Sequence, residues 1–138
     1  MTKLVDWGED LETGWSFMDE GHRRFVELLN RLHRASRDGT GNDAVSSTVS
    51  ELATVMNAHL DKEETAMLQS RYPLFSDHKM QHDYMRLKLK ELERDIGAGT
   101  QITAAELIDH LMNWLAQHTR RHDRDLARHL AKRVSVGR

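Results

Sequence analysis

Apolar side chains recur at alternating steps of three and four residues in four stretches of this chain. That period is typical of an amphipathic helix with one face toward a core. In the second stretch, Val45, Val49, Leu52 and Met56 follow one another in this way. Signals for β-strands are nearly absent. The pattern therefore predicts an all-α fold.

Two glycine-rich segments and one proline separate the periodic stretches. Residues 38–42 and 97–100 favour turns, and Pro73 precedes the third stretch. We therefore expect an irregular N-terminal arm over residues 1–18. Four helices follow it, over residues 19–37, 43–69, 76–96 and 103–131. With 138 residues, of which 38% are hydrophobic, the chain can bury one core, so a single domain over residues 1–138 is expected.

Seven polar residues lie in these stretches, most of them on the apolar faces. They are five histidines and two carboxylates: His22, His59, Glu63, His78, His82, His118 and Asp123. Carboxylates are seldom fully buried unless they are paired or bound to a metal ion, because burying an isolated charge is very unfavourable. A shared metal site explains all seven positions with one cause.

The spacing of these residues supports a shared site. Residues four apart on a helix differ by about 40° in direction and about 6 Å in height, so both can bind one ion. Two pairs have this spacing, His59 with Glu63 and His78 with His82. His118 and Asp123 are five residues apart, and on a regular helix their directions differ by about 140°. That separation indicates a centre with more than one ion.

Each of these residues has a simpler interpretation when it is taken alone. A single histidine on an apolar face is more often a hydrogen-bonded core residue, and a histidine four residues from a glutamate can be an ordinary helical pair. The combination favours metal binding, because four helices would otherwise have to bury polar residues independently. The remaining histidines are expected to be structural: His33, His110, His122 and His129. Of these, His122 stays a candidate because it lies one turn after His118.

The composition excludes several classes of protein and site. The chain has no cysteine, which excludes disulfides, thiolate metal sites and cysteine nucleophiles. It has neither an apolar run long enough to span a membrane nor the basic start and apolar centre of a signal peptide. We therefore expect no membrane insertion and a cytoplasmic location. The net charge of -2 gives no reason to expect a nucleic-acid partner.

The order of the polar residues resembles the ligand pattern of hemerythrins. A first histidine is followed by His-x-x-x-Glu, His-x-x-x-His and His-x-x-x-x-Asp, and the four elements begin at His22, His59, His78 and His118. The resemblance to bacterial hemerythrins covers essentially the whole chain. Further matching positions are Trp7, Leu11, Thr13, Gly14, Met18, Asp19, Tyr72, Pro73, Trp114 and Leu115. The resemblance implies an up-down-up-down antiparallel four-helix bundle.

The resemblance also implies a non-haem di-iron centre with a bridging oxo or hydroxo group and dioxygen as its ligand. The residues that would bind one iron ion (Fe2+/Fe3+) are His78, His82 and His118, and those that would bind the other are His22 and His59. Glu63 and Asp123 would bridge the two ions. Together with the bridging oxygen, these ligands would fill all but one position of two octahedral ions. The open position lies on the iron held by two histidines, and it is where the family binds dioxygen.

An apolar lining around the open position would limit the entry of water and protons. By resemblance this oxygen pocket includes Phe25, Leu60, Trp114, Leu115 and Thr119. Thr119 departs from the family, which commonly has an aliphatic residue there, and its hydroxyl can hydrogen-bond oxygen or admit water. Gly21 also departs, since a glutamine often precedes the first histidine.

The function that this resemblance implies is reversible dioxygen binding for oxygen storage, transport or delivery, by a monomer. We expect no enzymatic activity, because no obvious general acid lies beside the open position unless Thr119 or His122 relays protons. One alternative is an oxygen or redox sensor that acts through a partner protein. Another is a di-iron peroxide or nitric oxide reductase. The same ligand types also accept zinc or manganese.

Overall fold

The computed structural model describes residues 11–37, 42–97 and 104–136. Within these ranges the chain is helical, without a strand. Its elements are α1 (Ser16–Arg37), α2 (Asn42–Gln69), α3 (Phe75–Gly97), α4 (Ala104–His118), η2 (Thr119–Asp123) and α5 (Arg124–Val136). The predicted all-α fold is confirmed. Residues 1–10 of the predicted arm, and Trp7 with them, lie outside the described ranges.

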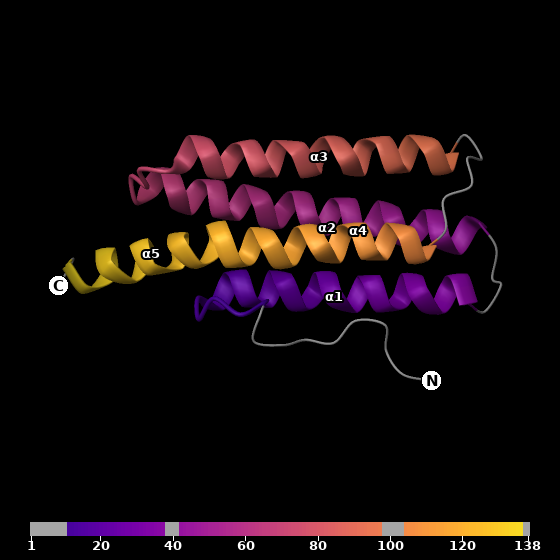
Figure 1. The fold of residues 1–138 in the computed structure, drawn as a ribbon, viewed down its shortest axis with the longest axis horizontal. Helices are drawn as coiled ribbons and strands as arrows, with labels where there is room; N and C mark the ends of the chain where they lie inside the picture. Colours follow the sequence, from indigo (N-terminus) through magenta and orange to yellow (C-terminus); the bar gives the residue numbers. More distant parts are fainter. Residues whose placement is uncertain (1–10, 38–41, 98–103, 137–138) are drawn as a thin grey trace.

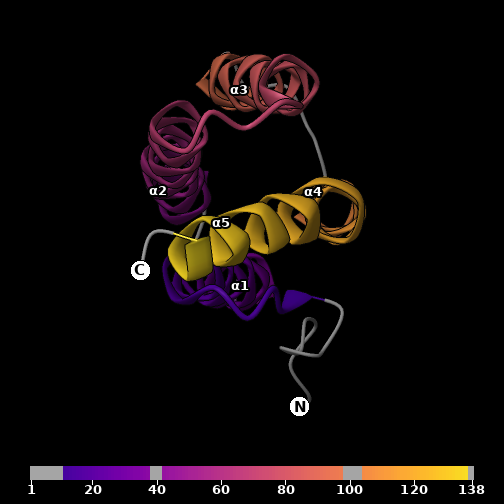
Figure 2. The ribbon, with the colours of Figure 1, turned by 90° about the vertical axis from the view of Figure 1, so that its left-hand side faces the viewer.

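The helices form an antiparallel four-helix bundle. Figure 1 shows α1, α2, α3 and α4 as neighbouring rods whose directions alternate along the chain. Seen along the bundle, α1, α2, α3 and α4 follow one another around the core, and α5 crosses toward α1 (Figure 2). This is the up-down-up-down arrangement that the family resemblance implied. None of the helices in the described ranges is long and apolar enough to span a membrane.

The first helix begins at Ser16, three residues earlier than predicted. The carboxylate of Asp19, in the first turn of α1, binds the segment that precedes the helix. It accepts hydrogen bonds from the Thr13 backbone N–H at 2.8 Å, the Thr13 hydroxyl at 3.0 Å and the Gly14 N–H at 3.1 Å. Gly14 has a φ of 82°, a conformation that glycine adopts without steric cost. The helix therefore starts where a side-chain acceptor satisfies the chain that enters it.

The fourth predicted helix is not one regular helix. A π-helical turn, η2, separates α4 from α5, and its last hydrogen bond runs from the Arg124 N–H to the Thr119 carbonyl. A π turn joins residues five apart, whereas an α turn joins residues four apart. The predicted helix over 103–131 is therefore divided by a π turn at this point, and Thr103 itself lies outside the described ranges.

Two apolar clusters lie along the bundle. The larger one fills the interior of α1, α2, α3 and α4 and includes Phe25, Leu52, Met85 and Leu111. The smaller one lies where α5 meets the ends of α1 and α2, and it includes Met18, Met67, Tyr72, Leu126 and Leu130. Six of the seven polar residues predicted to bind metal occupy sequence positions between these two clusters, and His59 lies directly before Leu60 of the larger cluster.

Candidate metal centre

All seven predicted ligands meet inside one end of the bundle. His22 comes from the first half of α1, and His59 and Glu63 come from the second half of α2. His78 and His82 lie near the start of α3, His118 ends α4, and Asp123 ends η2. Glu63, His82 and Asp123 have no exposed surface, and His59, the most exposed of the seven, is 8% exposed. Short loops and alternating helix directions bring these turns together, although they lie up to 101 residues apart in the chain.

Glu63 lies at the centre of the group. Its Oε1 atom is 3.0 Å from Nε2 of His78 and 3.0 Å from Nε2 of His82. Its Oε2 atom is 2.7 Å from Nε2 of His59. The two oxygens of this carboxylate therefore face different sets of histidines.

The two oxygens of Asp123 also face different histidines. Oδ1 lies 3.0 Å from Nε2 of His118 and 3.1 Å from Nε2 of His78. Oδ2 lies 3.1 Å from Nε2 of His22. The π turn makes this possible, because it places Asp123 beside His118 and not about 140° away as a regular helix would. The five-residue spacing was therefore misjudged as a sign of divergent side chains.

The ligand atoms form two groups that share a carboxylate. Glu63, His78, His82, His118 and Asp123 each offer an atom within 4.8 Å of the others, and so do His22, His59 and Glu63. The first group contains three histidines and the second contains two. This arrangement is suitable for two metal ions bridged by carboxylates.

Several of these atoms fit a metal ion better than they fit one another. Nε2 of His59 and Oε2 of Glu63 are close, yet both are buried without a hydrogen bond of acceptable geometry among the described residues. Oδ1 of Asp123 is also buried without such a hydrogen bond. Buried polar atoms normally have a partner, so atoms that converge without bonding to each other indicate a common third partner. Imidazole and carboxylate ligands suit iron, zinc and manganese.

The carboxylates and imidazoles of the group shift one another's pKa values. Burial opposes a charge on His118, but the Asp123 carboxylate outweighs burial and raises the pKa of His118 to about 9. Burial and the neighbouring Glu63 oppose ionisation of Asp123, but His118 and His22 hold its pKa well below the usual range. The pKa of Glu63 is also lowered, against burial, by the surrounding histidines. Without metal, the carboxylates are therefore ionised and share the protons of nearby imidazoles.

Two ligands are oriented by hydrogen bonds outside the group. Nδ1–H of His22 can donate to the Leu11 carbonyl at 2.8 Å when Nε2 faces the centre. Nδ1 of His82 lies 2.8 Å from Oε2 of Glu64, and the Arg86 guanidinium holds that carboxylate at 2.7 Å. The sequence did not identify Glu64 or Arg86, because neither differs in pattern from an ordinary charged residue on the outer face of a helix.

The five residues predicted to line an oxygen pocket are found in different surroundings. Phe25, Leu60 and Leu115 are buried in the larger apolar cluster, and the Trp114 ring stacks on His118 with centroids 4.5 Å apart. Thr119 is completely buried, and its hydroxyl oxygen has no hydrogen-bond partner among the described residues. A hydroxyl therefore lies unpaired beside the ligands, where the family commonly has an aliphatic side chain.

His122 is close to the centre without belonging to either ligand group. Its ring centroid is 5.3 Å from that of His118 and 5.6 Å from that of His78. Burial and the neighbouring His118 lower its pKa, which favours the neutral form. The ligand atoms that lie within 4.8 Å of one another do not include an atom of His122. This residue contacts the ligands from outside.

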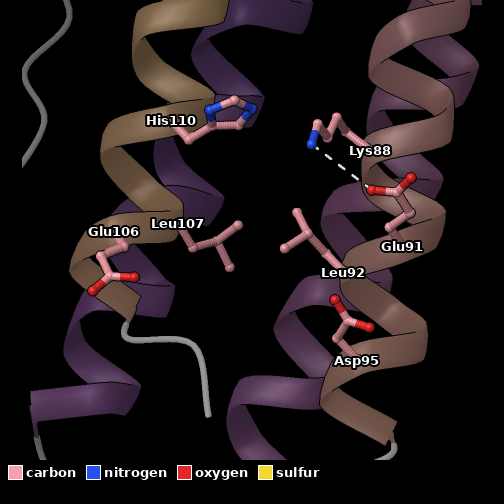
Figure 3. A pocket seen from close by; sticks show the side chains of 7 residues that line it. All are labelled: Lys88, Glu91, Leu92, Asp95, Glu106, Leu107 and His110. Carbon is pink, nitrogen blue, oxygen red and sulfur yellow. Dashed lines mark ion pairs between the residues drawn. The ribbon is translucent and has the colours of Figure 1, made fainter. Parts of the chain in front are cut away.

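A separate hollow opens between α3 and α4, away from the seven residues. Figure 3 shows Leu92 and Leu107 facing each other across it, with His110 above them and the Lys88 to Glu91 ion pair on the α3 side. Its volume is about 240 Å³, and its lining contains none of the predicted ligands or oxygen-pocket residues. This hollow therefore gives no access to the candidate metal centre.

Comparisons with known proteins agree on one family. Residues 13–130 match the family model described as Hemerythrin HHE cation binding domain. Bacteriohemerythrin from Stenotrophomonas maltophilia (strain R551-3) is 32% identical over 124 residues, covering 90% of this chain and 80% of that protein. Bacteriohemerythrin from Pseudomonas aeruginosa (strain LESB58) is 33% identical over 123 residues, covering 89% of this chain and 78% of that protein. A crystal structure of wild-type hemerythrin has the same fold, with a TM-score of 0.86 at 23% identity, covering 92% of this chain and 98% of that one.

Proposed function

The chain belongs to the hemerythrin family, and from this premise we propose that it binds dioxygen reversibly at a non-haem di-iron centre, for oxygen storage, transport or delivery. The observation that carries the proposal is that the two oxygens of each buried carboxylate face different groups of histidines. Glu63 and Asp123 each face a three-histidine group with one oxygen and a two-histidine group with the other. Two ions held by these unequal groups and joined by both carboxylates would leave an open position on the ion with fewer histidines.

Each residue has a distinct task in this proposal. His78, His82 and His118 would hold one iron ion and His22 and His59 the other, while Glu63 and Asp123 keep the two ions at a fixed separation. When bound, the iron pair supplies the electrons that dioxygen takes up on binding and returns on release. The buried side chains of Phe25, Leu60 and Leu115 keep bulk water from the ligands. Trp114 fixes the plane of the His118 ring by stacking on it.

One observation favours an alternative function. The Thr119 hydroxyl follows His118 in the chain and is buried without a hydrogen-bond partner on any described residue, and a hydroxyl there can pass a proton inward. A reductase of peroxide or nitric oxide needs such a proton, whereas a carrier is impaired by it. A long-lived oxygenated protein would therefore support a carrier, and a short-lived one would support a reductase.

The experiment that tests the function is an oxygen cycle. The protein is reduced without oxygen, oxygen is admitted and then removed, and the optical spectrum is followed through several cycles with iron counted per chain. We expect two iron ions per chain and a spectral change that reverses in each cycle. Rapid irreversible oxidation would favour a sensor or a reductase. A single zinc ion with no visible spectrum would refute the di-iron proposal.

Removing the Thr119 hydroxyl is expected to prolong the oxygenated state. Thr119→Val keeps the shape of the side chain, and Thr119→Ile restores an aliphatic residue of the kind common in the family. Both changes remove a buried polar atom, and we expect the oxygenated spectrum to decay several-fold more slowly than in the unchanged protein. The measurement is the rate of spontaneous oxidation in air. A decay rate that is unchanged or faster in both variants would show that the hydroxyl does not promote oxidation.

A further inference from the structure

A surface cavity of about 250 Å³ lies between α1 and α2 and reaches one of the predicted ligands, His59. Gly21 and Arg24 border it from α1, and Lys62 borders it beside His59 on α2. Helices α1 and α2 are neighbours along their length (Figure 2). The cavity is thus a path from the surface to the outer edge of a ligand histidine.

Gly21 makes room for the His59 ring. A Cβ atom added at Gly21 would overlap Nδ1 of His59 and would lie 2.5 Å from its Cε1 atom. Any other residue would therefore force the imidazole to move. Gly21 and His59 both border the cavity, and Nδ1 is the ring atom of His59 nearest to Gly21.

Nδ1 of His59 is a hydrogen-bond donor without an acceptor on any described residue. Nε2 of the same ring points to Glu63 at 2.7 Å, so Nδ1 carries the proton when Nε2 binds metal. His22 and His82 direct the same atom at the Leu11 carbonyl and the Glu64 carboxylate, each at 2.8 Å. The His59 side chain is only 8% exposed, and it borders the cavity beside Gly21, the residue that packs against Nδ1. The missing acceptor must come from outside the described chain.

The charges around the cavity favour an anion as that acceptor. Lys62 and Arg24 border it with positive side chains, and Glu20 contributes one negative charge. The Arg24 guanidinium already pairs with Glu51 at 3.4 Å and with Glu27 at 3.6 Å, whereas no carboxylate on a described residue forms an ion pair with Lys62. Lys62 is therefore the cation of this cavity that is available to a ligand with a single negative charge. Phe17 and Val55 add apolar surface that an organic anion can contact.

We propose that this cavity binds a small monocarboxylate, which accepts the Nδ1–H hydrogen bond of His59 and pairs with Lys62. A carboxylate in that position makes the imidazole a stronger ligand, as Glu64 does for His82. The anion therefore tightens metal binding on the two-histidine side of the centre. The inference rests on the proposed function only in that His59 must bind a metal ion through Nε2.

The test uses the iron-loaded full chain with acetate as the probe. Acetate binding is measured by calorimetry at constant ionic strength, with chloride as the balancing anion, and iron loss to a chelator is followed with and without acetate. We expect saturable binding of acetate and an iron loss that is about tenfold slower when acetate is bound. Lys62→Gln should weaken acetate binding several-fold, and Glu20→Gln should strengthen it, because one removes an attraction and the other a repulsion.

Lys90→Gln is the matched control, since Lys90 is an exposed lysine on α3 and does not border the cavity. Acetate that bound the iron ions directly would bind the Lys62→Gln variant and the control equally, and would overturn the proposal. Binding without any effect on iron loss would also overturn it, because the contact with His59 would be missing. If the oxygen cycle is normal but acetate does not bind, the carboxylate site fails alone. If acetate binds but two iron ions give no reversible cycle, the proposed function fails alone.

Discussion

The Glu63→Ala variant is expected to lose both metal ions. Glu63 is fully buried, and its two oxygens face histidines of both ligand groups, so its removal takes one ligand from each ion. It also leaves buried imidazoles without their negative partner. We expect metal affinity to fall by at least about 100-fold and the free energy of unfolding to fall by about 3 kcal/mol or more. Metal content per chain and thermal unfolding measure the two effects.

Glu27→Gln is the control for this change. Glu27 also lies in the bundle, but its side chain is 69% exposed and faces solvent with Arg24. Its substitution should leave metal content unchanged and alter the free energy of unfolding by less than about 0.5 kcal/mol. Two metal ions retained by Glu63→Ala would show that this carboxylate does not bridge them. Asp123→Asn tests the second bridge by the same measurements.

The metal-free protein is expected to lose stability as the pH rises from 6.5 to 9. His118 has a pKa raised from 6.5 to about 9 in the folded chain, against burial, by the Asp123 carboxylate. A group with a raised folded pKa stabilises the fold fully below its unfolded pKa, and that contribution is lost as pH rises through the folded pKa. The change at His118 lowers the free energy of unfolding by about 3 kcal/mol, which lowers the melting temperature by on the order of 10 °C. His22 and His78, whose pKa values are also raised against burial, act in the same direction.

The metal-loaded protein should not show this loss, because a metal ion on Nε2 replaces the proton as the partner of the carboxylates. Thermal unfolding at pH 6.5 and pH 9, with and without metal, measures the contrast. His110→Gln serves as the control, since His110 is an exposed histidine outside the centre and its substitution should leave the pH dependence unchanged. A metal-free chain that is equally stable at both pH values would contradict the shared-proton description of the centre. At the acid end, the lowered pKa values of Glu63 and Asp123 predict that stability falls as these carboxylates become protonated.

Most of the fold followed from the period of apolar residues. The steps of three and four between Val45 and Met56 predicted α2, and the observed helix, Asn42–Gln69, begins one residue before the predicted one and ends at the same residue. The glycine-rich segments separated the helices because glycine interrupts a helix at a cost of about 1 kcal/mol. These signals are local, and a local signal can be recognised without knowing the neighbours in space.

The candidate site was predictable to the extent that its residues share helical faces. His59 with Glu63 and His78 with His82 are neighbours by spacing alone, and the structure places all four at the centre. The π turn was not predictable, because no residue from Thr119 to Asp123 requires it by its own propensity. Packing selects it: the turn brings Asp123 to 3.0 Å from His118, where both ligand groups can use the carboxylate.

The helical residues, the apolar faces and the seven polar residues that interrupt those faces could be predicted from the sequence, because helix period and ligand type are properties of residues close in the chain. The packing of the helices was needed to show which histidines each carboxylate oxygen faces, why Glu64 supports His82, and why Gly21 must lack a side chain beside His59. These features depend on distances between helices that are far apart in sequence, and such distances are set by the packing of the whole bundle.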